Sequence, residues 1–339
     1  MGSVRRALAV TTAVLVVAGA AGCSQGATHG PPPVGQGRPA PSAAPTPAQA
    51  AADPGNCDTH ASPYRPSQAG GPTVDAIKAR GYLIAGIDLN DYEWGFLGPD
   101  GRPQGFDVDI VNAIAQSLFG RADPQTVHYV PVDDDQRIPR LRSTDPQQHV
   151  DLVVHTMTVT CQRQQQVAFS TVYYQAGQRV LVPKAGNRSD ESGPDALKGK
   201  RVCTAVGSTS ADLLAADARL PEGQQRFPGA VVHTEQNELD CLARDLQQHR
   251  ADAVLTDDAI AYGLAAQDPE TMVVGAALTE EPYAVAMPST SKDLVAWVNQ
   301  VLEDYRSSGQ WKHSYETWLL RYLPAGQPEP TPPPAVYAP

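Results

Sequence analysis

A segment of apolar residues runs into hydroxyl side chains and an arginine at residues 150–174. Its sequence, VDLVVHTMTVTCQRQQQVAFSTVYY, begins as a buried strand and then offers Thr156, Thr158, Thr160 and Arg163. A hydrophobic core does not require these residues. Hydroxyls and the planar fork of a guanidinium are instead suited to hold a carboxylate. The end of this strand is therefore a candidate ligand-binding site.

Two further segments carry groups of the same kind. In GSTS, Gly207, Ser208 and Thr209 precede a predicted helix, whose free N–H groups attract an anion. Ser208 is equally suited to be a plain helix cap. In LTDD, Asp257 follows a predicted strand, at the edge where α/β sheets place ligand contacts. A nucleotide loop of the form GxxxxGK[ST] is absent, so GSTS does not predict nucleotide binding.

Alternating strands and helices must position these side chains. The first series has helices at 74–81, 105–119 and 137–143 and strands at 82–88, 127–132 and 150–158, and Asp107 is expected to cap the second helix. The second series has strands at 197–206, 230–235 and 251–258, helices at 207–218 and 238–249, and two closing helices at 294–307 and 311–323. Crossings between the series are expected at 174–180 and 279–283. This is the pattern of two open α/β sheets.

Both ends of the chain differ in composition from the middle. Residues 1–22 resemble a lipoprotein signal peptide, with a short apolar stretch followed by small residues before Cys23, which would carry the lipid. An ordinary signal peptide is the alternative. Residues 23–72 and 324–339 are rich in proline and poor in large apolar side chains, which predicts a disordered tether and a disordered tail.

The number of cysteines bears on disulfide bonding, and the net charge bears on the possible partners of the protein. Four cysteines remain besides Cys23, and an even number in an exported protein predicts two disulfides, although free thiols are the alternative. Cys203 ends a predicted strand and Cys241 lies on the next long helix, which favours Cys203–Cys241 and leaves Cys57–Cys161. The net charge of −11, without a basic stripe, argues against nucleic acid as a partner.

Six groups of motifs resemble bacterial extracellular solute-binding proteins of the polar amino-acid type. In chain order they are GFDVDIVNAIA, RIPRL, VDLVV with TMTVT and VAFSTVYY, LKGKRV with GSTS, ADAVLTDD, and LEDYRSSGQWKHSYETWL. The resemblance implies a two-lobed α/β fold of the type II periplasmic-binding-protein kind, each lobe a mixed sheet flanked by helices. Two hinge strands would join lobe 1 (73–177 plus 281–323) to lobe 2 (178–280), closing on a ligand.

The resemblance also implies roles for the polar residues. It places Arg163 on the α-carboxylate of an amino acid, with Thr158 as a hydroxyl donor beside it and Ser208 and Thr209 as donors from lobe 2. A surface salt bridge is the alternative for Arg163.

The same resemblance assigns the α-ammonium of the ligand. The backbone carbonyl of Thr156 and the carboxylate of Asp257 would receive it. Thr156 has an alternative reading, because β-branched residues are common in strands.

The side chain of the ligand is open between acidic and amide groups. Asp88 matches a position that accepts from a side-chain amide, and Arg137 matches an arginine that serves a side-chain carboxylate. Arg137 would either pair with Asp88 or hold the ligand. Tyr92 and Trp94 lie where the family has an aromatic wall, and Ala205 replaces the lysine of glutamine binders. The expected ligand is Glu, Asp, Gln or Asn.

These expectations give a function without catalysis. Nothing in the sequence matches GxSxG, HExxH or a zinc-site spacing, so no enzyme, cofactor or metal is expected, although some proteins of this fold have lyase activity and His155 is a candidate for it by position. The protein would be a membrane-anchored extracytoplasmic monomer that delivers its ligand to an ABC-type permease. Signalling through a membrane partner to a kinase is the alternative.

Overall fold

The computed structural model describes residues 57–186, 192–323 and 331–338, which belong to the compact unit Ala50–Pro339. The predicted signal peptide, Cys23 and the tether up to residue 56 lie outside the described residues, as do residues 324–330. Within the described ranges, no helix combines the length and the apolar character needed to cross a bilayer.

Lobe 1 is built on a mixed sheet. Its strands, in pairing order, are β6 (Val127–Pro131), β2 (Leu83–Ile87), β7 (Leu152–Val153), β16 (Ala286–Pro288) and β8 (Val167–Phe169). The helices of one face are α1 (Pro72–Arg80), α2 (Phe106–Phe119), α9 (Lys292–Ser307) and α10 (Gln310–Trp318), and α3 (Arg137–Arg142) covers the other face. Smaller elements are β3 (Asn90–Asp91), β4 (Gly95–Leu97), β5 (Pro103–Gln104), η1 (Asp134–Gln136), α4 (Cys161–Gln164) and η4 (Leu320–Tyr322).

Lobe 2 repeats this plan. Its strands pair in the order β12 (Val231–Glu235), β11 (Arg201–Ala205), β13 (Ala253–Asp257), β10 (Gln178–Pro183) and β14 (Thr271–Val274). The helical elements are α5 (Gly193–Leu197), α6 (Thr209–Asp217), η2 (Glu222–Gln224), α7 (Glu238–Asp240), the π-helical segment η3 (Cys241–Leu246) and α8 (Asp258–Gln267). The single helix expected at 238–249 is thus a short α-helix that continues as a π-helix.

Alternation along the strands of lobe 2 explains its layers. Val202 and Leu255 belong to the core on the side of α5 and α6, whereas Cys203 and Val254 belong to the core on the side of η3 and α8. Successive side chains of a strand point to opposite faces, so a strand that is apolar throughout is covered on both sides. The continuous apolar runs in the sequence indicate such a covered sheet.

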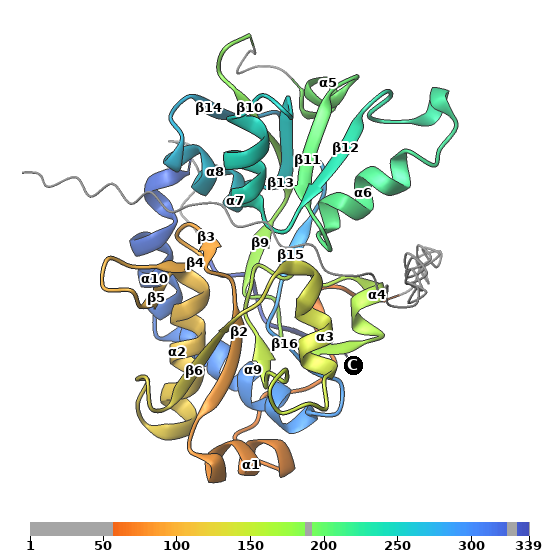
Figure 1. The fold of residues 1–339 in the computed structure, drawn as a ribbon. Helices are drawn as coiled ribbons and strands as arrows, with labels where there is room; N and C mark the ends of the chain where they lie inside the picture. The colour runs from red at the N-terminus through yellow and green to blue at the C-terminus, as the bar shows by residue number, and fades with distance from the viewer. Residues whose placement is uncertain (1–56, 187–191, 324–330, 339) are drawn as a thin grey trace, which may run out of the picture. The chain divides into compact units, whose positions relative to one another are not determined.

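Two crossing strands lie between the sheets. β9 (Tyr174–Ala176) pairs antiparallel with β15 (Glu281–Tyr283), with Tyr174 opposite Tyr283. Figure 1 shows this pair between the sheet of lobe 1 and the sheet of lobe 2. The predicted two-lobed α/β fold with two hinge strands is confirmed.

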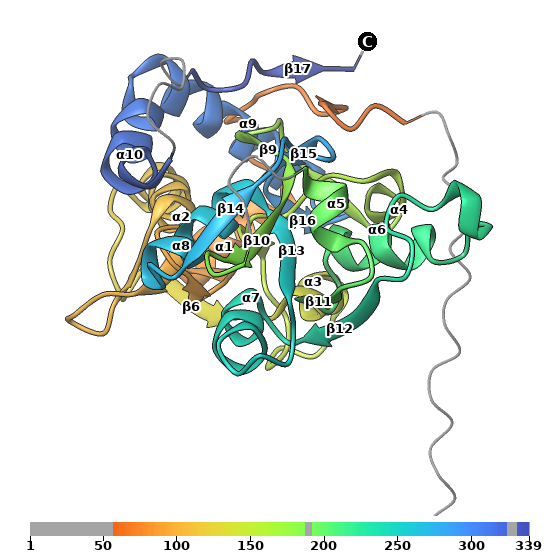
Figure 2. The same ribbon diagram turned by 90° about the horizontal axis from the view of Figure 1, so that it is seen from above.

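The prediction of disorder is wrong for the described parts of both ends. β1 (Ala61–Ser62) pairs in parallel with β17 (Val336–Tyr337), and Figure 2 shows the two strands side by side. Ser62 is buried and its hydroxyl donates to the Phe169 carbonyl. Proline-rich segments 57–72 and 331–338 are ordered because they bond to each other and to lobe 1, a tertiary effect that composition does not reveal.

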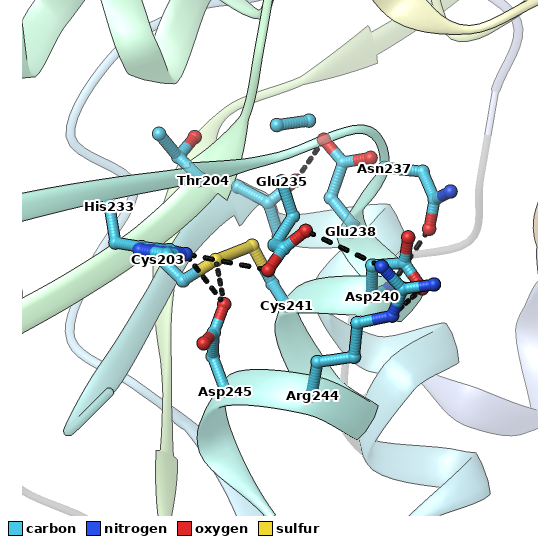
Figure 3. The surroundings of a disulfide bond; sticks show 12 residues. Cys203, Thr204, His233, Glu235, Asn237, Glu238, Asp240, Cys241, Arg244 and Asp245 are labelled. Carbon is cyan, nitrogen blue, oxygen red and sulfur yellow. Dashed lines mark hydrogen bonds and ion pairs between the residues drawn. A yellow bond between two sulfur atoms is a disulfide. The ribbon is translucent and has the colours of Figure 1, made fainter. Parts of the chain in front are cut away.

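Both predicted disulfides are confirmed. Cys57 joins Cys161 and Cys203 joins Cys241, each with 5.6 Å between the Cα atoms. Figure 3 shows the second bond between β11 and the start of η3. The first bond fixes the start of the described chain to α4, two residues before Arg163.

Candidate functional site

A narrow cavity lies where the strand ends of the two lobes meet. Its lining side chains are Asp134, Arg137, Thr156, Thr158 and Arg163 from lobe 1 and Ser208, Thr209, Ser210, Glu238, Thr256, Asp257 and Ile260 from lobe 2. A wider hollow of about 390 Å³ shares Asp134, Arg137 and Arg163 with it. Seven of the nine predicted ligand residues are therefore brought together, and Asp88 and Tyr92 are not among the lining residues.

Arg163 lines both this cavity and the wider hollow. It sits in α4, where the Thr160 hydroxyl accepts its backbone N–H as an N-cap. Its guanidinium donates to the carbonyls of Thr158 at 2.8 Å and Gly207 at 3.0 Å. Burial, and then the nearby charge of Arg137, lower its pKa to about 10. Among the described residues it forms no ion pair, so its charge is free to meet an anion.

Arg137, in contrast, is already paired. Its guanidinium lies 3.1 Å from the carboxylate of Asp134 and donates to the carbonyls of His155 and Gly207. Both partners of the Arg137–Asp134 pair are almost fully buried. Asp134 is therefore the counter-ion of Arg137, for which the sequence predicted either a ligand carboxylate or Asp88.

Thr156 occupies a strained position between the strand and the cavity. Its φ of 41° lies in the left-handed region, which β-branched residues rarely adopt. Its N–H donates to Asp107 over 2.8 Å, and the hydroxyl of Tyr173 donates to the same carboxylate over 2.8 Å. The expectation that Asp107 caps α2 is wrong, because the carboxylate points into the lobe and holds Thr156 instead.

Ser208 and Thr209 make different contacts at the start of α6. Ser208 is the N-cap: its oxygen accepts from the N–H of Ala211 and its hydroxyl donates to the carbonyl of Ala205. The hydroxyl of Thr209 donates to Glu281 over 2.9 Å. Both hydroxyls are engaged within the protein and also line the cavity, and the helix-cap alternative holds for Ser208 alone.

Asp257 ends β13 at the opposite wall. The hydroxyl of Tyr283, from crossing strand β15, donates to its carboxylate over 2.5 Å. Burial, followed by the charge of Glu281, raises the pKa of Asp257 well above its usual range. A cation arriving beside this carboxylate would offset both causes of that shift.

Asp88 lies behind the cavity, paired with His155. The two side chains approach to 3.0 Å, and the backbone N–H groups of Asn90 and Asp91 donate to the same carboxylate. Burial alone would raise the pKa of Asp88, but His155 and the backbone donors outweigh it and lower the pKa. This internal pair takes the place of the alternative in which Asp88 pairs with Arg137, and the ligand contact of Asp88 stays a prediction.

Tyr92 is half-buried and lines a different narrow pocket. Its ring packs against Phe96 and Tyr322, and its hydroxyl meets that of Tyr322 at 3.2 Å. Trp94 is buried among the aromatic rings of lobe 1. The predicted aromatic wall is therefore absent from the lining, because the sequence did not determine which way the turn at residues 90–95 projects its rings.

Two acidic residues of the lining were not predicted from the sequence. Asp134 belongs to η1, after β6, and Glu238 begins α7, after β12. The run of three aspartates at 133–135, just after a strand, was the available signal for Asp134. Glu238 was hidden inside a helix predicted from its leucines.

The comparison with protein families decides the identity of this architecture. Residues 83–321 match the model of the bacterial extracellular solute-binding proteins, family 3. The chain belongs to this family.

Individual relatives agree with the family. The ABC transporter glutamine-binding protein GlnH of Bacillus subtilis (strain 168) is 31% identical, over 73% of this chain and 84% of its own. A solved ancestral arginine-binding protein bound to glutamine is 34% identical, with a TM-score of 0.61, over 70% of this chain and 98% of its own.

A third relative is an amino-acid-binding protein that is the precursor of an enzyme. The solved ancestral amino acid-binding protein AncCDT-1, a precursor of cyclohexadienyl dehydratase, is 30% identical, with a TM-score of 0.62, over 73% of this chain and all of its own. These relatives are amino-acid-binding proteins, and this chain is a solute-binding protein of the same family. Its cavity is lined by two buried ionisable groups, the guanidinium of Arg163 from lobe 1 and the carboxyl group of Asp257 from lobe 2.

Proposed function

We propose that this solute-binding protein captures a polar L-amino acid by closing its two lobes and delivers it to an ABC-type permease. The observation that carries the proposal is Arg163, a buried guanidinium bonded only to carbonyls among the described residues, in a cavity whose other wall holds Asp257. An amino acid carries one carboxylate and one ammonium. The two walls thus match its two charges.

The ligand carboxylate would meet Arg163, with Thr158 beside it and the start of α6 at Ser208 and Thr209 facing it. An Arg–carboxylate pair in a water-poor site is stronger and more directional than one at the surface. The ligand ammonium would meet Asp257 and the carbonyl of Thr156. Binding would join the lobes, because these residues come from both sheets.

The side chain is proposed to be polar. The sequence favours Glu, Asp, Gln or Asn, and the names of the relatives in Bacillus subtilis and among the ancestral structures support glutamine within this set. Arg137, already paired with Asp134, is less available for a ligand carboxylate than the sequence suggested. That contact favours the amides over the acids within the set.

Anchoring and delivery complete the proposal. Lipid on Cys23 would hold a monomer outside the cell membrane, and the ordered segment from Cys57 onward would connect the tether to lobe 1. A membrane sensor that reads the closed form is the second candidate, since α4, which carries Arg163, is covalently joined through Cys161 to Cys57, the residue that follows the proposed tether.

The test is calorimetric titration of the purified full-length protein with each of the twenty amino acids. The protein is first unfolded and refolded, so that carried-over ligand is removed. Binding of at least one polar amino acid supports the proposal. A folded protein that binds none of the twenty contradicts it.

A further inference from the structure

A histidine and two carboxyl groups meet at the outer edge of the lobe 2 sheet. Nε2 of His233 lies 3.4 Å from Oε1 of Glu235 and 3.4 Å from Oδ2 of Asp245. These three residues form the edge cluster, in which one atom of each lies within 4.8 Å of the others. Figure 3 shows the imidazole facing both carboxyl groups, beside the disulfide of Cys203 and Cys241. None of the three residues lines the ligand cavity, so the edge cluster is separate from the proposed amino-acid site.

The fold brings these side chains to one face of the sheet. His233 and Glu235 are two positions apart on edge strand β12, so their side chains point to the same face. His233 pairs with Cys203 of β11, which belongs to the core on the side of η3. Asp245 lies on η3, and the bond between Cys203 and Cys241 ties η3 to the sheet. Single π-helical turns such as η3 are frequent at functional sites.

The buried carboxyl group of Asp245 lacks hydrogen-bond donors. Its side chain is 1% exposed, and its Oδ1 has no hydrogen-bond partner among the described residues. Nε of Arg250 lies 3.1 Å from this oxygen but donates to the carbonyl of Arg244 over 2.7 Å. Oδ2, which faces His233, lies 3.2 Å from the sulfur of Cys203, and a disulfide sulfur has no proton to donate. Because buried carboxylates are normally hydrogen-bonded, Oδ2 is available to another electron-pair acceptor.

The spacing within the edge cluster suits a tetrahedral cation better than direct hydrogen bonds. Bonds of about 2.1 Å from Zn²⁺ to nitrogen and oxygen separate neighbouring ligand atoms of a tetrahedron by about 3.4 Å. Nε2 of His233 has this distance to both carboxyl oxygens, whereas N–H···O bonds usually measure about 2.7–3.2 Å. The side chain of His233 is 50% exposed, so water can reach a fourth coordination position.

The charges around the edge cluster leave room for a cation. Arg244 pairs with Asp240 at 3.1 Å, and Arg250 pairs with Asp245 at 3.1 Å. The same two guanidiniums lie 3.9 Å from the carboxylate of Glu235, too far for a hydrogen bond. Three carboxylates thus face two guanidiniums, and both arginine side chains are more than half exposed. A divalent cation would supply Glu235 with a close counter-charge, because the arginines can turn toward solvent.

We propose that His233, Glu235 and Asp245 bind a divalent transition-metal cation, for which Zn²⁺ is the best match. Nε2 of His233 and one oxygen of each carboxylate would hold the metal, with water as the fourth ligand. The metal would tie β12, which pairs with β11 alone, to η3 and so stabilise lobe 2. No metal was expected from the sequence, because these residues become neighbours only when η3 packs on the sheet.

The experiment is calorimetric titration of the full-length protein with Zn²⁺, after treatment with EDTA and removal of the chelator. We expect a site with a Kd of about 1 µM or tighter in the wild type. His233→Ala and Glu235→Gln should each weaken binding at this site by about 10-fold or more. Both side chains are at least partly exposed, so the two variants should keep the wild-type fold, which circular dichroism checks.

His128→Ala is the matched control, since His128 is an exposed histidine on β6, the edge strand of the lobe 1 sheet, and its ring stacks on Tyr82. This variant should bind Zn²⁺ as the wild type does. Thermal unfolding gives a second readout, because a cation that binds only the folded state raises the unfolding temperature. Zn²⁺ should raise this temperature in the wild type and in His128→Ala, and much less in His233→Ala.

Three results overturn the inference. The first is a wild-type protein that binds no Zn²⁺. The second is unchanged affinity and thermal shift in His233→Ala and Glu235→Gln, which would mean adventitious metal bound elsewhere. The third is an equal loss of affinity in His128→Ala. None of these results bears on the proposed amino-acid site, because the titrations contain no amino acid and the edge cluster does not line that cavity.

Discussion

The guanidinium of Arg163, in lobe 1, donates a 3.0 Å hydrogen bond to the carbonyl of Gly207, in lobe 2. Arg137 donates to the same carbonyl at 3.4 Å. Gly207 thereby joins the two arginines of one lobe to the turn before α6 in the other. The contact couples the orientation of Arg163 to the approach of the lobes, so a change at Gly207 should alter ligand binding without altering either core.

Gly207→Ala should weaken ligand binding about 10-fold or more. Gly207 has a φ of 81°, and an added Cβ would lie 2.7–2.8 Å from the backbone of Asp135 across the lobe contact. The left-handed conformation alone costs about 1 kcal/mol for alanine. Gly199→Ala is the control, because Gly199 has a φ of 65° with nothing within 4 Å of the added Cβ. Equal ligand affinities for the two variants in calorimetry would contradict the predicted role of this contact.

Asp257→Asn should lower the affinity for the amino acid by about 30-fold or more. Removing one partner of a buried charge pair costs about 2–5 kcal/mol, because the other charge is left buried. Asp258→Asn is a matched control: this neighbour accepts from the N–H of Ala259 at the start of α8 and does not line the cavity. Calorimetry would refute the assignment if both variants bound as the wild type does.

The raised pKa of Asp107 predicts that the stability of the folded protein depends on pH. Burial raises its pKa to about 6, although bonds from Thr156 and Tyr173 oppose the shift. The folded protein thus keeps a proton that the unfolded chain loses near pH 4. The contribution of the protonated Asp107 carboxyl to the free energy of unfolding is complete below about pH 4. It is lost as the pH rises to about 6, at up to about 1.4 kcal/mol per pH unit.

Asp107→Asn should remove this part of the pH dependence. Urea unfolding of the wild type and the variant between pH 4 and pH 7 measures the difference in the free energy of unfolding. The wild type should lose about 3 kcal/mol relative to the variant over this interval. Parallel curves would show that the Asp107 carboxyl has no raised pKa in the folded protein.

The layers of sheets and helices could be predicted from the sequence because burial of a strand on both faces leaves a continuous apolar run. Continuous apolar runs within the predicted strands, such as 83–87 and 253–255, indicated sheets covered on both faces, and they lie in β2 and β13. Arg163 and Asp257 were singled out for a related reason: charged groups near the ends of such strands have no role in a core. The disulfide between Cys203 and Cys241 followed from the same strand-then-helix order.

What the sequence did not predict depends on tertiary neighbours. Arg137 and Asp88 were expected to meet a ligand or each other, yet each found another buried partner, Asp134 and His155 respectively. Charge type is visible in a sequence, but the choice among several buried partners depends on distances of a few ångströms. The direction of Tyr92 is a problem of the same kind, since two-residue strands leave little periodicity to read.

The order of the proline-rich ends was missed for a different reason. Composition describes what a segment can bury by itself. The strand pair of β1 with β17, and the bond from Arg306 to the carbonyl of Pro333, are supplied by distant parts of the chain. Such long-range contacts outweigh an unfavourable local composition.

The most direct test of the account is ligand affinity in Arg163→Ala, measured by calorimetry beside Arg142→Ala with the tightest-binding amino acid. Arg142 is exposed and lines the neighbouring hollow, where it donates to Gln166. The account predicts a loss of about 100-fold or more for Arg163→Ala, since a buried carboxylate would lose its guanidinium, and little change for Arg142→Ala. Undiminished affinity in a folded Arg163→Ala protein would contradict the assignment of this cavity as an amino-acid site.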